Sequence, residues 1–161
     1  MGEFMTAVTS LERDGSLREW QAGEFVAAYR SFSLTRAGRV FLGCRMLLHP
    51  AGRERIESEL ARFRKARSAQ PLGARSAGCS FKNPPGESAG RLLDRCGCKG
   101  MSVGGARVSE RHANFIVNEG RATASDVLSL MRLCQTTVLA RTGVRLEPEV
   151  RVIGLDIQGA C

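Results

Sequence analysis

The sequence lacks any apolar run approaching the roughly 18 residues that a membrane-spanning helix requires. Residues 1–5 also lack the basic and apolar regions of a secretory signal, so we expect a cytoplasmic protein with no membrane partner. A shortage of hydrophobic residues, which would indicate disorder, is not found: 43% of the residues are hydrophobic and 25% are charged. No internal repeat is found either, and the 161 residues are enough for one domain and part of a second.

Histidine is scarce, and the cysteines do not form a metal-binding pattern. The two histidines, His49 and His112, lie far from the C-x-C pair Cys96 and Cys98, and no second pair stands at zinc-finger spacing. We therefore predict no metal site. Without a secretory signal we also expect no disulfides, and most of the six cysteines are expected to act as small hydrophobic side chains.

Lysine supplies only three of the 24 basic residues, which stand against 16 acidic residues and give a net charge of +8. We attribute the excess of arginine to genome composition rather than to a binding code. The segment 53–68, RERIESELARFRKARS, places Ile56, Leu60 and Phe63 on one face of a predicted helix. A basic nucleic-acid-binding module is one alternative for this helix, but its three glutamates favour a solvated helix that links two domains.

The first fifty residues are predicted to be rich in β-structure. Strands over 6–13 and 16–20 flank the hairpin signal Asp14-Gly15. A short helix is predicted over 23–28, and the apolar run VFLGCRMLL at 40–48 indicates a buried strand.

Helices and strands alternate between residues 87 and 154, which indicates a compact α+β domain. We predict a short helix over 89–96, strands over 101–108, 114–118 and 145–153, and a long helix between the Thr123–Asp126 capping box and Gly143. Residues 69–90, rich in proline and glycine, are predicted to be a functional loop.

Three places combine chemically active side chains, and each allows a structural alternative. Arg30, beside the only tyrosine, could hold a carboxylate or phosphate, or it could form a surface ion pair. The loop 79–83 places a thiol beside anion-binding groups, or it is a packed turn. Glu149 lies in an apolar segment, where a carboxylate needs a function or an ion pair with Arg151.

Several motifs occur together in one order: YR, QP, AGxxFKNP, AGRL, KGxxxGGAxVSxxHANFIVN and LEPEVRxIG. Through them the chain resembles the UDP-N-acetylenolpyruvoylglucosamine reductases, also called UDP-N-acetylmuramate dehydrogenases, of bacterial peptidoglycan synthesis. The resemblance extends over residues 1–154 and is densest from 75 to 154. It implies a flavoenzyme that uses NADPH and FAD to reduce the enolpyruvyl group of a UDP-sugar, giving UDP-N-acetylmuramate.

The resemblance also implies roles for the three candidate residues. Arg30 matches the arginine that binds and polarises the enolpyruvyl carboxylate, and Glu149 matches the active-site glutamate of the same step. The family's proton donor is a serine, and Cys79 stands in its place. Because an unperturbed thiol has a pKa of about 8.5 and releases its proton more readily than a hydroxyl, we expect Cys79 to act as the acid. Ser80, one residue later, is expected to point to the other face.

Four further residues are implied in substrate binding. Asn83 and His112 match positions that contact the diphosphate region, Arg67 is a further cationic contact, and Lys82 has either a binding or a structural role. Phe32 departs from the family, which has Ser or Thr at that place in its YRxS pattern.

The glycine-rich FAD-binding region that begins the family's sequences, which are about twice as long, is not found in this chain. We therefore assign no cofactor-binding residue. The resemblance assigns residues 1–52 to the β-rich tail of an FAD-binding domain, 53–70 to a linking helix and 71–161 to the α+β substrate-binding domain. The chain is expected to be a truncated reductase that lacks its N-terminal FAD-domain half. The alternative is an inactive remnant, or a standalone domain that binds a UDP-sugar.

Overall fold

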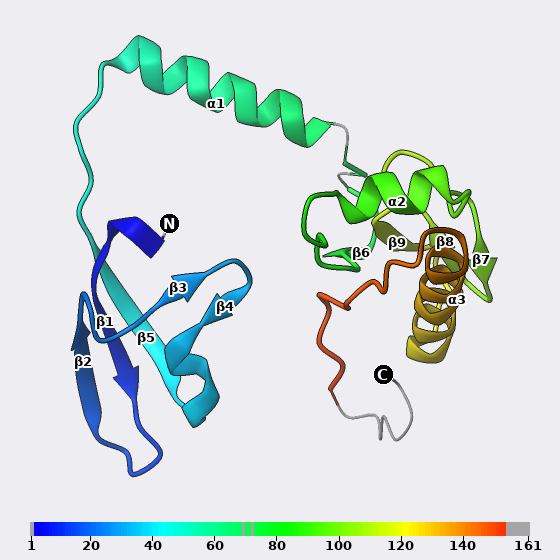
Figure 1. Cartoon of the computed structure of the whole chain (residues 1–161). Helices are drawn as coiled ribbons and strands as arrows, with labels where there is room; N and C mark the ends of the chain where they lie inside the picture. The colour runs from blue at the N-terminus through cyan, green and yellow to red at the C-terminus, as the bar shows by residue number, and fades with distance from the viewer. Residues whose placement is uncertain (1, 69, 72, 154–161) are drawn as a thin grey trace. The chain divides into compact units, whose positions relative to one another are not determined.

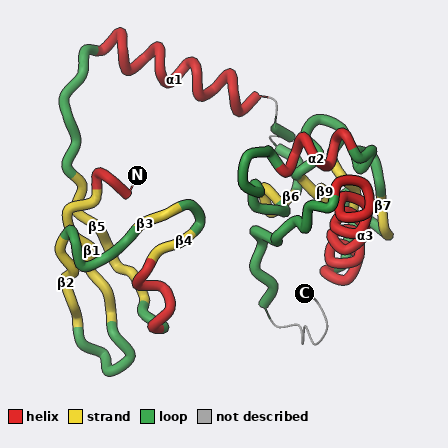
Figure 2. Tube along the Cα trace, in the orientation of Figure 1, coloured by secondary structure: helices red, strands yellow, loops and turns green. Residues whose placement is uncertain are grey.

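The computed structural model describes residues 2–68, 70–71 and 73–153 of the chain. The chain forms two compact units, Met1–Glu57 and Ser58–Cys161. Its helices and strands are shown in Figure 1, and their assignment along the chain in Figure 2. We describe each unit by itself.

The N-terminal unit is built on a three-stranded antiparallel sheet in the order β2-β1-β5. Its elements are η1 (Gly2–Phe4), β1 (Met5–Leu11), β2 (Leu17–Gln21), β3 (Ala27–Ala28), β4 (Ser31–Phe32), η2 (Ser33–Ala37) and β5 (Val40–Met46). The predicted hairpin is confirmed: Gly15 has a φ of 83°, and the Asp14 carboxylate accepts a hydrogen bond from the Ser16 amide at 2.9 Å. The helix predicted over 23–28 is wrong. Gly23, with a φ of 99°, stands in a turn there, and Ala27 begins β3.

The core of this unit is small, and the buried residues Val8, Trp20 and Leu34 form its centre. The Trp20 ring lies 3.5 Å from the Arg18 guanidinium carbon and 4.5 Å from that of Arg39. Its indole N–H donates a hydrogen bond to the buried Ser10 hydroxyl at 2.8 Å. Trp20 is thus the only aromatic side chain among the three buried residues of this cluster, and the core is small for a unit of this length.

Strand β5 corrects the prediction of a buried strand over 40–48. The strand exists, but all its residues from 40 to 45 are exposed, and Leu47 and Leu48 beyond it are exposed too. Among the described strands, only β1 pairs with it. Apolarity predicted a strand correctly, but it did not show whether the chain itself covers that strand.

Helix α1 (Arg53–Ser68) confirms the predicted helix and its bounds, and no residue in it is buried. Its own charges pair along the helix: Arg53 with Glu57 at 2.7 Å, and Arg62 with Glu59 at 2.6 Å. The basic face is therefore partly neutralised by the helix's own acids.

The C-terminal unit packs helices against a four-stranded antiparallel sheet in the order β6-β9-β8-β7. The elements are β6 (Ser76–Cys79), α2 (Ala89–Arg95), β7 (Ser102–Val103), β8 (Ala106–Val108), β9 (Phe115–Asn118) and α3 (Ala124–Thr142). Mixed helix and sheet confirm the predicted α+β class. Strand β6 lies inside the segment 69–90, so the prediction of a loop throughout that segment is corrected.

Helix α3 follows the sequence prediction closely. Thr123 and Asp126 form a reciprocal capping box, and Gly143, with a φ of 71°, ends the helix. The buried residues of α3 are Leu130, Met131, Cys134 and Val138, and Val127 is partly buried against the same core. This stripe packs with α2 and with the sheet to form the main core.

The structure corrects two of the predicted strands, those over 101–108 and 145–153. The segment 101–108 is a hairpin of β7 and β8, because the chain turns at Gly104, which has a φ of 53°. The segment 145–153 is not a strand. It makes an isolated antiparallel bridge between Phe81 and Pro148, and the Ser80 amide donates to the Asn114 carbonyl instead of to residue 149, so the ladder does not continue there.

Three of the predicted hydrophobic cysteines, Cys96, Cys98 and Cys134, are buried in this core. Burial raises the pKa of the Cys134 thiol to about 12 and also raises the pKa of Cys98. Cys44 is exposed, and Cys79 is half-buried. All five are free thiols; Cys161 lies outside the described residues.

No helix in the described part of the chain is long and apolar enough to cross a membrane. The same residues hold no group of three or more histidine, cysteine and acidic side chains that could bind a metal ion.

Candidate functional site

The segments that carry two of the candidate residues, Cys79 and Glu149, are hydrogen-bonded where the chain leaves β6. The Glu149 amide donates a hydrogen bond to the Ser80 carbonyl at 2.9 Å, and the Lys82 amide donates to the Glu147 carbonyl at 2.8 Å. Cys79, the last residue of β6, pairs with Phe115 on β9. Residues 149 and 79 thus lie on neighbouring backbone segments, although 70 positions separate them in the sequence.

Local geometry separates Cys79 from Ser80. Gly78 has a φ of 85°, a left-handed conformation that glycine adopts without strain, and Cys79 follows it half-buried. Ser80 is buried. The two neighbouring residues therefore differ in their exposure.

Asn114, which no sequence motif singled out as a site residue, fixes the backbone of this region. Its side chain is 2% exposed, donates to the Phe81 carbonyl at 2.8 Å and accepts from the Phe81 amide at 2.9 Å. Its carbonyl accepts from the Ser80 amide at 2.8 Å. A buried amide that satisfies both polar groups of one residue holds the segment in a single position. The only signal in the sequence was an asparagine inside the apolar stretch ANFIV.

Asn83 and Lys82 both have structural partners. The Asn83 side-chain oxygen accepts from the Ala89 amide at 3.0 Å, so it connects the loop to the start of α2. The Lys82 ammonium forms an ion pair with Glu147. The structural alternative for Lys82 therefore has direct support, while its pair remains partly exposed to solvent.

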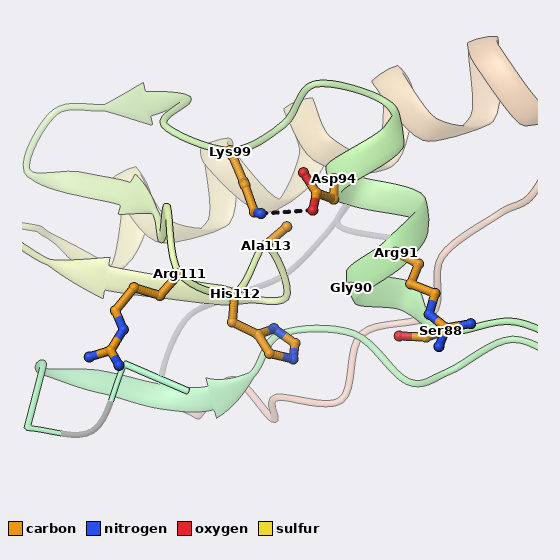
Figure 3. A pocket seen from close by; sticks show the side chains of 8 residues that line it. All are labelled: Ser88, Gly90, Arg91, Asp94, Lys99, Arg111, His112 and Ala113. Atoms are coloured by element: carbon orange, nitrogen blue, oxygen red, sulfur yellow. Dashed lines mark hydrogen bonds and ion pairs between the residues drawn. The ribbon is translucent and has the colours of Figure 1, made fainter. Parts of the chain in front are cut away.

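The same unit holds a pocket of about 250 Å³, which includes Ala113, the residue before Asn114 (Figure 3). The residues that line it are Ser88, Gly90, Arg91, Asp94, Lys99, Arg111, His112 and Ala113. Lys99 forms an ion pair with Asp94 at 2.7 Å, and the Arg111 guanidinium donates to the Ser68 carbonyl at 2.8 Å. Three cations and one carboxylate make the lining suitable for an anion.

His112 joins the pocket to strand β9. Its ring lies 4.9 Å from the Phe115 ring, edge to face, and its Nδ1 accepts from the Asn114 amide at 3.2 Å. Burial lowers the pKa of His112 from its ordinary 6.5, and the charge of Lys99 lowers this pKa further. Nδ1 acts as an acceptor, so the proton of the neutral ring is on Nε2, which can donate to a ligand.

Gly90 is needed for this arrangement. A Cβ at position 90 would lie 2.9 Å from His112 Cε1, closer than side chains approach one another. The AGRL motif therefore places a glycine under the imidazole and an arginine, Arg91, at the pocket. Arg91 and Arg111 were not predicted as site residues, although both belong to motifs that carry the family resemblance.

Two candidates lie outside this group. Arg67 is in the last turn of α1 and is exposed; its neighbour Ser68 contacts Arg111. Arg30 lies in the N-terminal unit, in the turn between β3 and β4, and it is the only described residue other than glycine with a positive φ (52°). Strain of this kind persists only where the surrounding structure maintains it, and it is common at functional positions.

Comparison with known proteins decides the family. A family model described as the UDP-N-acetylenolpyruvoylglucosamine reductase C-terminal domain matches residues 70–153. The chain belongs to the UDP-N-acetylenolpyruvoylglucosamine reductase family. The matched range includes Cys79, Lys82, Asn83, His112 and Glu149, whereas Arg30 and Arg67 precede it.

Individual reductases agree with this assignment. The chain is 44% identical over 155 residues to UDP-N-acetylenolpyruvoylglucosamine reductase 2 of Symbiobacterium thermophilum, covering 96% of this chain and 50% of that protein. It is 45% identical over 157 residues to the reductase of Moorella thermoacetica, covering 96% and 51%. The crystal structure of the Thermus caldophilus reductase matches with a TM-score of 0.80 and 40% identity, over 94% of this chain and 54% of that one. The chain thus spans about half the length of the reductases that it matches.

Proposed function

We propose that this chain provides the substrate-binding part of an enzyme that reduces UDP-N-acetylglucosamine enolpyruvate to UDP-N-acetylmuramate in the cytoplasm, for peptidoglycan precursor synthesis. The observation that carries the proposal is the backbone pairing of segments 80–82 and 147–149, which brings Cys79 and Glu149 onto neighbouring segments of the unit that also holds the cationic pocket. Family membership supplies the reaction class.

Cys79 is the proposed proton donor. In the reaction the enolpyruvyl group gains a hydride at C3 and a proton at C2, and the intermediate between the two additions carries extra negative charge beside its carboxylate. The Cys79 thiol, placed within hydrogen-bond reach of C2, can supply this proton and then take up another proton from water. Arg30 and Glu149 are proposed to act at the carboxylate end, where a cation stabilises the developing charge.

The cationic pocket is proposed to hold the diphosphate of the UDP-sugar. Arg91 and Arg111 can each present two N–H groups to phosphate oxygens, and His112 presents Nε2–H. Asn83 contributes by connecting the loop to α2, and Arg67 is proposed as a cation at the α1 end.

FAD and NADPH are proposed as cofactors of the whole enzyme, in which they supply the hydride. One pocket of the N-terminal unit was considered for FAD. The pocket of the N-terminal unit, about 340 Å³, is lined by Met5, Val8, Phe32, Phe41, Leu42, Gly43 and Cys44. None of these side chains is a cation or another donor that could neutralise a pyrophosphate. We therefore assign no residue of this chain to either cofactor.

Calorimetric titration of the full chain with UDP and with the enolpyruvyl UDP-sugar tests the proposed substrate site. We expect both to bind, and we expect Arg91→Ala and Arg111→Ala to weaken binding about tenfold or more, as the loss of a charge-assisted contact predicts. Arg132→Ala, on the exposed side of α3, is the matched control. If neither ligand binds at millimolar concentration, or if all three variants behave alike, the pocket is not the diphosphate site.

Nucleic-acid binding is not proposed. The helix that suggested it, α1, pairs Arg53 and Arg62 with its own glutamates. The cations of the pocket lie in a concave site of limited volume rather than along a continuous basic face.

A further inference from the structure

Arg111 belongs both to the cationic pocket and to the end of helix α1. Its side chain lines the pocket, and its Nη2–H donates to the carbonyl of Ser68, the last residue of α1, at 2.8 Å. The two residues lie in the same compact unit, 43 positions apart in the sequence. A single side chain thus connects an anion site with a helix terminus.

The Ser68 carbonyl is one of the groups that an α-helix leaves without an intrahelical donor. The last four carbonyls of a helix lack such donors, and they carry the negative end of the helix dipole. The neighbouring Arg67 carbonyl accepts from the Gln70 amide at 3.0 Å, and the Ser68 carbonyl accepts from the Arg111 guanidinium. The cation of Arg111 therefore satisfies a terminal carbonyl and also favours the dipole of α1.

Burial does not hold the last turn of α1. All 16 residues of the helix are exposed. The ion pairs of Arg53 with Glu57 and of Arg62 with Glu59 lie before the last turn. Most of the stability of a protein helix comes from packing one of its faces, so an exposed helix opens and closes readily at its ends. The stability of the turn 65–68 is therefore sensitive to the contact with Arg111.

The Arg111 guanidinium has donors to spare. It carries five N–H groups, and the bond to Ser68 uses one of them. Phosphate oxygens accept charge-assisted hydrogen bonds, which are about twice as strong as neutral ones. Arg91 lines the same pocket from α2 (Figure 3), and within the described residues it makes no hydrogen bond to α1. Arg91 is therefore a natural comparison for Arg111.

We propose that Arg111 couples the pocket to α1: with one N–H on the Ser68 carbonyl and others on a phosphate group, it makes diphosphate binding stabilise the last turn of α1. By thermodynamic reciprocity, a more stable last turn also raises the affinity for the diphosphate. The boundary between the two compact units falls within α1, so occupancy of the pocket is transmitted to the segment that connects them. The inference rests on the proposed function for the identity of the anion.

Hydrogen exchange of the full chain, followed by mass spectrometry on peptides that cover 62–68, tests the coupling. UDP and inorganic pyrophosphate are added separately, each at a concentration that saturates the protein measured. We expect either ligand to slow exchange in 65–68 about fivefold or more. Arg111→Ala should abolish this effect, and so should Arg111→Lys, because an ammonium group lacks the planar fork that spans two acceptors. Arg91→Ala should bind more weakly but keep the effect once saturated.

Reciprocity gives a second measurement, which a purely structural contact would not move. Ala66→Gly loosens the last turn of α1 at a residue that does not line the pocket, and it should raise the Kd for UDP about two- to fivefold in calorimetric titration. Ala140→Gly makes the same change at an exposed position in the last turn of α3, and it should leave the Kd unchanged. In the Arg111→Ala background, Ala66→Gly should have no further effect on the Kd.

The outcomes separate this coupling from the proposed function. Unchanged exchange in 65–68 under saturating UDP overturns the coupling and leaves the proposed function standing. An effect that survives in Arg111→Ala, or equal Kd values in Ala66→Gly and Ala140→Gly, also overturns it. If pyrophosphate binds and slows exchange in 65–68 but UDP does not bind, the coupling stands and the proposed function fails. If neither ligand binds, both are wrong.

Discussion

The Glu149 amide donates a hydrogen bond to the carbonyl of Ser80 at 2.9 Å, and Cys79 is the residue immediately before Ser80. A carboxylate-bearing residue near the C-terminal end is thereby held against the loop that carries the proposed acid. Three properties of this arrangement can be tested separately: the identity of the acid, the rigidity of the loop and the fit of the adjoining pocket.

The identity of the acid is tested by changing Cys79 in the complete enzyme, assembled with a reductase N-terminal part. We expect Cys79→Ser to retain substantial turnover, since serine is the family's donor, and Cys79→Ala to lose the step that consumes the enolpyruvyl substrate. Stopped-flow measurement of flavin reoxidation reports that step directly. Cys44→Ala, which removes an exposed thiol on β5, is the matched control. Normal turnover in Cys79→Ala would show that another group donates the proton.

The rigidity of the loop depends on Asn114. Replacing it with alanine leaves the amide and the carbonyl of Phe81 without their side-chain partner in a buried place, at a cost of about 2–4 kcal/mol in the free energy of unfolding. Urea denaturation followed by circular dichroism measures this change. Thr136→Ala, on the exposed side of α3, should cost well under ~1 kcal/mol. Similar values for the two variants would mean that Asn114 does not hold the loop.

The fit of the pocket depends on the absence of a side chain at position 90. In Gly90→Ala the new methyl group meets the His112 ring, so we expect the Kd for UDP to rise about three- to tenfold with little change in Tm. Gly52→Ala makes the same change where nothing lies within 4 Å, and it should leave the Kd unchanged. Titration calorimetry on the three proteins gives the comparison. If Gly90→Ala binds UDP with unchanged affinity, His112 does not take part in UDP binding.

The pKa of His112 predicts a pH dependence of stability. Because burial lowers this pKa in the folded state, the unfolded chain binds the proton more tightly, and folding stability falls as pH decreases through the unfolded value of 6.5. The loss of folding stability is complete once the pH is below the pKa of His112 in the folded state. Between about pH 7.5 and 5.5 we expect the wild type to lose more stability in urea than His112→Gln.

The Asp126 carboxylate does not obscure this window. Hydrogen bonds from the Thr123 backbone and side chain lower the pKa of Asp126 below its ordinary 3.8, so its contribution is lost only in stronger acid. Equal pH dependence in the wild type and in His112→Gln would contradict the assignment of the effect to His112.

Local patterns in the sequence predicted the elements that local interactions determine. The capping box at Thr123, the stop at Gly143 and the bounds of α1 follow from neighbours within one or two helical turns, and all three are confirmed. The helix over 23–28 was wrong because Gly23 adopts a left-handed conformation, which starts a turn instead. The strand over 145–153 was wrong because the segment pairs only through the bridge between Phe81 and Pro148, while the Ser80 amide donates to Asn114 instead of to residue 149.

The residues of the candidate site also differ in whether the sequence could predict them. Motif order placed Cys79, Asn83, His112 and Glu149 within one domain, and the structure brings the first and last of these onto neighbouring segments. Asn114 was missed because its role depends on a partner 33 residues away, which no periodicity reveals. The exposure of β5 was missed for a related reason: hydrophobicity shows that a strand needs cover but not which polypeptide provides it.

The distribution of the thiols has a practical consequence. Cys96, Cys98 and Cys134 are sealed in the core, and the pKa values of the last two are raised, so they react slowly with maleimides. Cys44 and Cys79 are the more accessible of the described cysteines. After Cys44→Ser and Cys161→Ser, a fluorescent or spin label would attach mainly at Cys79. The exchange of a hydroxyl for a thiol at the proposed proton donor therefore gives this chain a built-in attachment point for a spectroscopic reporter of substrate arrival.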